Sequence, residues 1–320
     1  MRRIAAALAV PLLAVLALAG CGSSTTPATN HGGSVKVSGA FGAAPTVTIP
    51  AAKASGKLAI KTVIQGNGPV LTSGDSFVGN YAVYIWSGST HKLALSTFAR
   101  GSTQGTPQVL AANVGLTGLK EALTGKRMGS RVLAVLPPKY AYGSKGNSQI
   151  GVKPTDTIVF VVDLIKDYSG TASASGKHVS NGGGGLPTVT ASPGTAPQVK
   201  IPSTRPPRKL IVKTLIRGSG PVTAKGQTVV TQYVGLNWRT GKVFDSSWQR
   251  HEPFGFTLDA TPAQIIPGWD KGLLGVPVGS RVMLIIPPAD GYGKAGNTEA
   301  GIKPTDTLVF VIDVLGAVSN

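Results

Sequence analysis

The sequence predicts an α+β protein of two repeated domains, each an antiparallel β-sheet packed on one short α-helix. The chain has 320 residues, a length that suggests two domains. Its 43 glycines and 23 prolines favour β-structure, turns and linkers over long helices. Two stretches of the chain also repeat each other at a period of about 150 residues, which indicates two whole domains and excludes a solenoid of short repeats.

The repeat is clearest near the two ends of each copy. Residues 61–70 match residues 213–222, and residues 152–160 match residues 302–310. The separation between copies falls from 152 residues at the first match to 150 residues at the second. The first copy therefore has two extra residues, which we place in the loop 87–90.

The second copy shows the expected elements most clearly. Runs rich in β-branched residues, bounded by glycine and proline, predict strands at residues 209–217, 227–236, 280–286 and 307–315. A hairpin turn is expected at residues 239–241. Pro267 suits the first position of a helix, and Ile265, Trp269 and Leu273 recur at the spacing of one helical face.

The N-terminus has the pattern of an export signal. Two arginines precede an almost wholly apolar segment, residues 4–20, which is short for a membrane span. The string Leu18-Ala19-Gly20-Cys21 resembles the lipobox of bacterial lipoproteins, whose cysteine is acylated. The alternative is an ordinary signal peptide that happens to contain a cysteine. We expect a protein anchored by lipid at Cys21 to the extracytoplasmic face of the cell membrane.

Composition divides the rest of the chain. We predict a signal peptide over residues 1–20, a flexible tether over 21–44 and a first domain over 45–168. Residues 169–195 are rich in Gly, Ser, Thr and Ala, a composition that predicts a flexible linker. The second domain then covers residues 196–320.

Charge and cysteine content limit the partners. The chain has 31 basic and 13 acidic residues, a formal net charge of +18, yet no run of basic residues exceeds two. This dispersion favours solubility near an anionic surface, membrane or cell wall, and we expect no nucleic-acid partner. A single cysteine excludes an intramolecular disulfide framework, and the four scattered histidines predict no metal site.

A series of short motifs in the second copy carries a resemblance to a known family. In order, the motifs are Thr231-Gln232-Tyr233-Val234-Gly235, Phe244-Asp245-Ser246-Ser247, Pro253-Phe254-Gly255-Phe256, Gln264-Ile265-Ile266-Pro267-Gly268-Trp269, Gly279-Ser280-Arg281, Ile286-Pro287-Pro288, Gly291-Tyr292-Gly293 and Leu308-Val309-Phe310. This ordered set closely resembles the FKBP family of peptidyl-prolyl cis-trans isomerases over residues 207–316. The whole layout resembles that of tandem-domain actinobacterial FKBP lipoproteins.

The resemblance implies a fold, a site and partners. The fold is a pair of FKBP-like domains, each with an antiparallel sheet wrapped around one short helix. The implied catalytic residues are Asp245, Tyr233, Phe244, Trp269, Tyr292 and Phe310. The implied substrate-binding residues are Arg250, Phe254, Ile265, Ile266 and Ile302. The resemblance also implies binding of macrolide immunosuppressants.

The chemistry of proline isomerisation agrees with such a residue set. Amide resonance sets a rotational barrier of about 18–20 kcal/mol. Rotation breaks no bond, so we expect no cofactor and no metal. A dry apolar pocket disfavours the polar planar amide, and fixed dipoles favour the twisted one.

Each of these residues also has a simpler interpretation. Trp269 and Phe310 alone are typical of an apolar core, Asp245 alone is typical of a turn, and Tyr292 between two glycines is typical of a loop. Their joint order is what favours the functional interpretation.

The first copy departs from the motifs at the site. Ala94 and Leu95 occupy the positions of Phe244 and Asp245, and Leu119 occupies the position of Trp269. The tyrosines at 81 and 142 and the phenylalanine at 160 remain. We therefore expect a degenerate first domain that is weak or inactive as an isomerase.

Three functions remain open at this point. The leading hypothesis is an isomerase that acts on proline-containing unfolded or nascent exported polypeptides. The alternative is a non-catalytic chaperone or a binding lipoprotein of the cell envelope. A structural envelope protein is favoured only by the linkers and the charge.

The N-terminal pattern generates the first testable prediction. The mature protein is expected to begin at an acylated Cys21 and to partition with membranes, and Cys21→Ser should leave it unprocessed or release it. Mass spectrometry of the mature N-terminus checks this. A soluble product that carries an unmodified Cys21 would contradict it.

Overall fold

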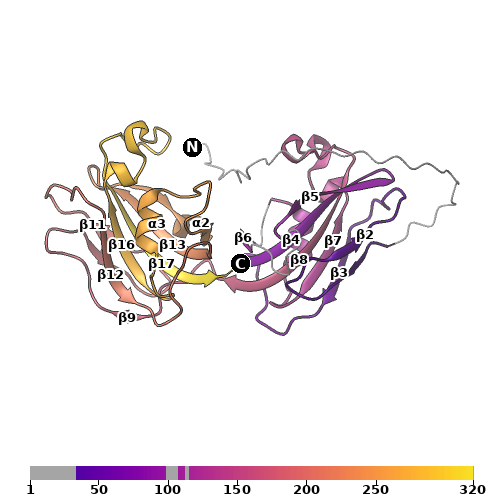
Figure 1. Ribbon diagram of the computed structural model, residues 1–320, viewed down its shortest axis with the longest axis horizontal. Coiled ribbons are helices and arrows are strands. Elements are labelled where there is room, and N and C mark those ends of the chain that lie inside the picture. The colour runs from indigo at the N-terminus through magenta and orange to yellow at the C-terminus, as the bar shows by residue number, and fades with distance from the viewer. Residues whose placement is uncertain (1–33, 99–106, 112–114, 320) are drawn as a thin grey trace. The chain divides into compact units, whose positions relative to one another are not determined.

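The computed structural model describes residues 34–98, 107–111 and 115–319 (Figure 1). The expected signal peptide and Cys21 lie outside the described residues. Among the described segments, no helix is long and apolar enough to cross a membrane. The predicted architecture of two α+β domains is confirmed, and each domain is described by itself below.

Domain 1 has a six-stranded antiparallel sheet in the order β3-β7-β8-β4-β5, with β6 also beside β4. Its strands are β3 (Ala59–Ile64), β4 (Ser76–Ser87), β5 (Thr90–Ser96), β6 (Gln108–Ala111), β7 (Arg131–Leu136) and β8 (Thr157–Tyr168). One helix, α1 (Thr117–Leu123), packs on the sheet. The 3-10 turns η1 (Pro138–Tyr140), η2 (Gly143–Lys145) and η3 (Ser148–Ile150) separate β7 from β8.

Domain 2 repeats this plan in a seven-stranded sheet, in the order β14-β13-β17-β16-β12-β9 with β15 also beside β13. Its strands are β9 (Lys177–His178), β12 (Ile211–Arg217), β13 (Thr228–Asn237), β14 (Val243–Ser246), β15 (Phe254–Thr257), β16 (Arg281–Ile286) and β17 (Leu308–Val318). Its helices are α2 (Ser247–Arg250) and α3 (Pro267–Leu273), with 3-10 turns η4 (Pro288–Asp290) and η5 (Gly293–Ala295). The four predicted strands and the predicted helix are confirmed.

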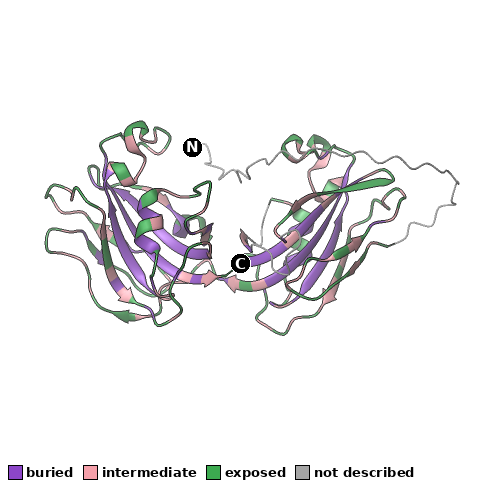
Figure 2. Ribbon diagram, in the orientation of Figure 1, coloured by how far each residue is buried: buried purple, intermediate pink, exposed green. Residues whose placement is uncertain are grey.

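Each sheet is apolar on both faces. Along β16, Val282, Leu284 and Ile286 join the cluster under α3, whereas Met283 and Ile285 join a second cluster on the opposite face. Buried residues consequently run continuously along the central strands (Figure 2). We call the face under the helix the inner face and the opposite one the outer face.

The inner face is covered by the helix. A Cβ at Gly268 would lie 2.6 Å from the Ile286 side chain, so this glycine allows α3 to approach β16 closely. Trp269 and Leu273 then lie buried on the sheet, as the helical spacing predicts.

The outer face of each sheet is covered by a short hairpin that precedes the domain. The hairpin strands are β1 (Lys36–Ser38) and β2 (Thr46–Thr48) in domain 1, and β10 (Thr188–Thr190) and β11 (Gln198–Lys200) in domain 2. Val37 and Ile49 pack with the outer cluster of domain 1, and Val189 and Val199 pack with that of domain 2. Without these hairpins the outer faces would expose large apolar surfaces.

Residues 34–44 and 169–195, for which the composition predicts flexibility, contain parts of these packed hairpins. Their composition suggested that they cannot bury a core, but their few valines complete the outer cluster. In addition, β9 pairs with β12, and the backbone N–H of Ala174 donates to the Asp313 carboxylate at 3.0 Å. The predicted domain borders at residues 45 and 196 divide these hairpins.

A buried ion pair joins the first hairpin to its sheet. Arg131 and Asp163 are fully buried, and the Arg131 Nε lies 2.6 Å from an Asp163 oxygen. The guanidinium also donates to the carbonyls of Gly39 and Ala43 at 3.0 and 2.6 Å, and the N–H of Gly42 donates to the carboxylate. These bonds satisfy both ions, as burial of charge requires.

The covered outer face generates a prediction about stability. Val189→Ala in the full chain should lower the free energy of unfolding of domain 2 by about 2 kcal/mol, because two buried methyl groups are lost. Thr190→Ala, on the exposed side of the same strand, is the control and should change it by less than about 0.5 kcal/mol. Urea unfolding measures both. Equal, small effects would mean that the hairpin does not stabilise the sheet.

Candidate active site

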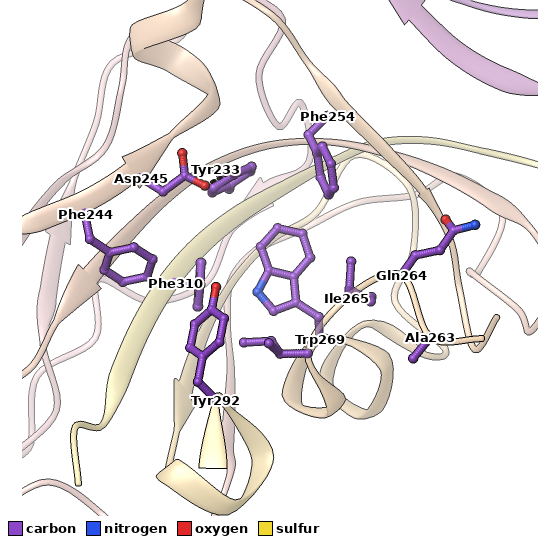
Figure 3. A pocket seen from close by; sticks show the side chains of 11 residues that line it. Tyr233, Phe244, Asp245, Phe254, Ala263, Gln264, Ile265, Trp269, Tyr292 and Phe310 are labelled. Carbon is purple, nitrogen blue, oxygen red and sulfur yellow. Dashed lines mark hydrogen bonds between the residues drawn. The ribbon is translucent and has the colours of Figure 1, made fainter. Parts of the chain in front are cut away.

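A cavity of about 300 Å³ opens on the inner face of domain 2, beside α3 (Figure 3). Most of its lining is apolar or aromatic, as is usual for a site that takes a small apolar group. Its lining residues are Tyr233, Phe244, Asp245, Phe254, Ala263, Gln264, Ile265, Ile266, Trp269, Tyr292 and Phe310.

Trp269 forms the floor of the cavity and is only 4% exposed. Tyr233 and Phe310 meet its indole edge-on, at centroid distances of 5.1 and 5.2 Å. Phe254 and Phe256 also lie edge-on to it, at 6.1 and 5.5 Å. Edge-to-face contacts of this kind stabilise a fixed ring arrangement beyond the burial of area alone, so the floor is rigid.

Two N–H groups at the floor have no acceptor among the described residues. The Trp269 Nε1 is buried without a hydrogen bond. The backbone N–H of Ile266, at the start of α3, likewise donates to no described group. Unpaired backbone donors are expected in the first turn of a helix, and the N–H of Ile266 can donate to a carbonyl oxygen of a bound chain.

One carboxylate stands at the edge of this aromatic cavity. Asp245 accepts hydrogen bonds from the Tyr233 hydroxyl and from Arg250 Nη1. Arg250 Nη2 also donates to the Tyr233 hydroxyl at 3.0 Å. The side chains of Asp245 and Arg250 are 40% and 44% exposed, so their ion pair contributes little stability and mainly orients the carboxylate.

The Tyr233 hydroxyl is the buried member of this polar group. Burial, reinforced by the negative charge of Asp245, raises the pKa of Tyr233 above the ordinary range of a phenol. Its hydroxyl therefore stays protonated and keeps donating to Asp245. Burial also raises the pKa of the Tyr292 phenol, whose hydroxyl lies across the cavity.

Ser247 fixes the backbone directly after β14, the strand that carries Asp245. The Ser247 hydroxyl accepts from the backbone N–H of Tyr233 at 2.7 Å and donates to the side-chain oxygen of Gln232. This anchors the start of α2 against β13. As a result, Asp245 on β14 lies in register opposite Gly235 on β13.

Nine of the eleven residues predicted from the resemblance line the cavity. Arg250 contacts it only through Asp245 and Tyr233. Ile302 lies behind it, buried in the core. Ala263 and Gln264 were not predicted, and their only signal in the sequence is that they directly precede Ile265.

Gly235 keeps the aromatic wall in place. A Cβ at this position would lie 2.7 Å from Phe310 Cε1 and 2.9 Å from Phe244 Cζ. These two rings meet edge-on at 5.5 Å and form the side of the cavity next to Asp245. Any side chain at 235 would therefore displace the wall of the site.

Domain 1 has a valine at the matching position. Val83 lies in register with Leu95 and Phe160, as Gly235 does with Asp245 and Phe310. Val83 is 1% exposed and belongs to the domain core. In domain 1 the side chain of Val83 takes the space that the Phe244 ring occupies in domain 2. A small residue, Ala94, at the position of Phe244 is consistent with this.

Domain 1 also has leucines in place of the tryptophan and the carboxylate, although the hydrogen bonds that hold the backbone beside the site are kept. Leu119 is buried where domain 2 has its tryptophan. Thr97 repeats the role of Ser247: its hydroxyl accepts from the N–H of Tyr81 at 2.8 Å and donates to Asn80 at 3.1 Å. The framework that would orient a carboxylate is present, but Leu95 provides none.

Comparison with known proteins gives a consistent result. The family model described as "FKBP-type peptidyl-prolyl cis-trans isomerase" matches residues 72–165 and 220–315. The "FK506-binding protein" of Streptomyces anulatus is 44% identical over 119 residues, which cover 37% of this chain and 94% of that protein. The "Probable FK506-binding protein" of Corynebacterium glutamicum is 37% identical over 121 residues, covering 38% of this chain and 98% of that protein. The crystal structure of FkpA from Escherichia coli has 39% identity over 34% of this chain and 48% of that chain, with a TM-score of 0.31.

The contact between Gly235 and the two rings generates a prediction. Gly235→Val should destabilise domain 2 by about 1–3 kcal/mol through overpacking. Combining it with Phe244→Ala recreates the valine–alanine pair of domain 1, so the double variant should be more stable than the sum of the single effects, by about 1 kcal/mol or more. Urea unfolding of the full chain and its three variants measures this coupling. Strict additivity would show that the ring and the valine do not compete for space.

Proposed function

The chain belongs to the FKBP-type peptidyl-prolyl cis-trans isomerase family, and on this premise we propose that its second domain catalyses rotation about X-Pro peptide bonds. One observation carries the proposal. Domain 2 combines a rigid aromatic cavity with a carboxylate, Asp245, that Tyr233 and Arg250 hold at its edge. Domain 1 has neither the tryptophan floor nor the carboxylate.

The proposed mechanism uses only side chains and backbone groups of this chain. The proline ring packs on Trp269 between the aromatic walls, which exclude water from the amide. Exclusion of water disfavours the planar amide, whose resonance gives it a large dipole. The carboxylate of Asp245 and the hydroxyl of Tyr292 provide fixed charges and dipoles around the rotating bond. The N–H of Ile266 holds a carbonyl oxygen of the substrate while the bond turns.

The proposed substrates are proline-containing segments of exported polypeptides that are not yet folded. The basis is the N-terminal pattern of an export signal with Cys21 at its end, which supports a location on the outer side of the cell membrane. Uncatalysed isomerisation takes tens to hundreds of seconds, slow enough to limit folding there. The cavity is also proposed to accept FK506-like macrolides, since two of the relatives are named for FK506 binding.

A second function is proposed for domain 1, that of a non-catalytic binder of extended chains. The observation that favours it is selective retention: the hydrogen bonds that join Thr97 with Tyr81 and Asn80 are present, whereas the carboxylate and the tryptophan are absent. A weak binding domain on the same chain would raise the concentration of client near domain 2.

The catalytic proposal predicts the effect of two substitutions in the full chain. Asp245→Leu and Trp269→Leu should each lower kcat/KM for an X-Pro peptide at least about tenfold, because a fixed charge or the pocket floor is lost. Leu95→Ala, at the domain 1 counterpart of Asp245, is the control and should leave the rate unchanged. A protease-coupled or NMR exchange assay measures the rates, and circular dichroism verifies folding.

Two outcomes would count against the proposal. A folded wild-type chain without activity would favour the binding-protein alternative. Full activity in Asp245→Leu together with a loss in Leu95→Ala would place catalysis in domain 1.

A further inference from the structure

Basic residues are segregated in this chain, although its sequence shows no long basic run. Residues 34–70 and 169–222 contain eleven lysines and arginines and no aspartate or glutamate. The eleven are Lys36, Lys53, Lys57, Lys61, Lys177, Lys200, Arg205, Arg208, Lys209, Lys213 and Arg217. All eleven are exposed. We call these two segments the basic layers of domains 1 and 2.

The charges of the basic layers are not neutralised within the described residues. The ion pairs in that part of the chain use Arg131, Lys225, Arg239, Arg250, Lys271 and Arg281, none of which belongs to a basic layer. These pairs engage six of the 13 acidic residues and none of the eleven cations. The two layers thus carry eleven positive charges and no negative one, in a chain whose formal net charge is +18.

The positions of the cations recur in the two domains. Three pairs lie at the same separation of 152 residues: Lys53 with Arg205, Lys57 with Lys209, and Lys61 with Lys213. In the hairpins, Lys36 lies opposite Thr48, whereas Thr188 lies opposite Lys200. The lysine has changed strand, but it occupies the same cross-strand pair. The four cations of the domain 1 layer thus each have a counterpart in domain 2, although domain 1 lacks the carboxylate and the tryptophan of the site.

The cations of the basic layers that lie on sheet strands are on the outer face or at the edge of each sheet. Lys61 is in register with Leu133, and Lys213 with Met283, and both partners belong to the outer clusters. Lys177 and Arg217 extend the layer of domain 2 along its edge, where they face each other in adjacent strands. The cavity lies on the inner face, so in domain 2 the cations and the site are on opposite sides of one sheet.

We propose that the basic layers bind an anionic lipid surface. The cations are spread over a hairpin, a connecting segment and an edge strand, which suits a diffuse layer of phosphate charge better than one small anion. Each lysine or arginine near such a surface adds to the affinity without needing a shaped pocket. Docking by the outer face would leave the cavity of domain 2 open to polypeptides on the side away from the lipid.

The test uses the chain from residue 22 onward, which retains every described element and lacks the apolar segment and Cys21, whose own lipid affinity would hide the effect. It is mixed with vesicles of phosphatidylcholine, or of equal parts phosphatidylcholine and phosphatidylglycerol, and sedimented. We expect binding to the anionic vesicles only. Raising salt from about 0.01 to 0.15 M should weaken it strongly, because the screening length falls from about 30 to 8 Å.

Two variants of equal net charge make the test specific. The layer variant changes Lys53, Lys57, Lys61, Arg205, Lys209 and Lys213 to Gln. The control variant changes six other exposed lysines to Gln, namely Lys120, Lys145, Lys153, Lys242, Lys294 and Lys303. The layer variant should lose at least tenfold in vesicle partition, since each cation near an anionic leaflet contributes roughly fivefold. The control variant should lose less than about threefold.

Three results would overturn the proposal. Equal losses in both variants would show that binding follows net charge and not the basic layers. No binding of the parent chain to anionic vesicles would refute a lipid surface directly. Retention by a mixed-sequence DNA duplex at the same salt, lost in the layer variant while vesicles are ignored, would assign the layers to nucleic acid instead.

Discussion

Each sheet of this protein must be covered on both faces, because its central strands carry apolar side chains on both sides. Most of the architecture follows from this constraint. The inner face of domain 2 receives α3, whose seven residues are too few to cover it. Aromatic side chains line the uncovered part, and the cavity lies among them. The outer face receives a hairpin made from segments of low complexity. Lys213 of the basic layer lies on this outer face, so it and the site are on opposite sides of the sheet.

The two domains separate the hydrogen bonds that hold the backbone of the site from the side chains that line the cavity. The bonds that join β13 to the start of α2 through Ser247 have a close equivalent at Thr97 in domain 1. These bonds hold the fold of the site whatever side chains project from it. The carboxylate, the tryptophan and the aromatic wall vary independently of them. In domain 1 the phenylalanine of the cavity wall is absent, and Val83 adds a side chain to the core in the space that Gly235 leaves to Phe244 and Phe310 in domain 2.

Ion pairs have two separate purposes in this chain. Arg131–Asp163 is fully buried, and hydrogen bonds from the hairpin satisfy it, so breaking it would leave an unpaired charge in the core. Arg250–Asp245 is partly exposed, contributes little to stability and orients a carboxylate at the edge of the cavity. The first kind joins a covering hairpin to its sheet, and the second prepares a site.

The sequence by itself determined the repeat, the α+β class, the strands and helix of domain 2, and nine residues that line its cavity. Those features depend on local patterns or on motifs whose spacing is set by the chain itself. Only the tertiary structure decided that the segments before each domain pack on the sheets, because a few valines in a Gly- and Ser-rich stretch become part of a core only when they meet a sheet formed from distant strands. The same holds for Gly235 and Val83, whose meaning lies in the rings that pack against them. It holds also for the basic layers, since the sequence alone does not show that Lys61 and Lys213 each lie on the outer face of their own sheet.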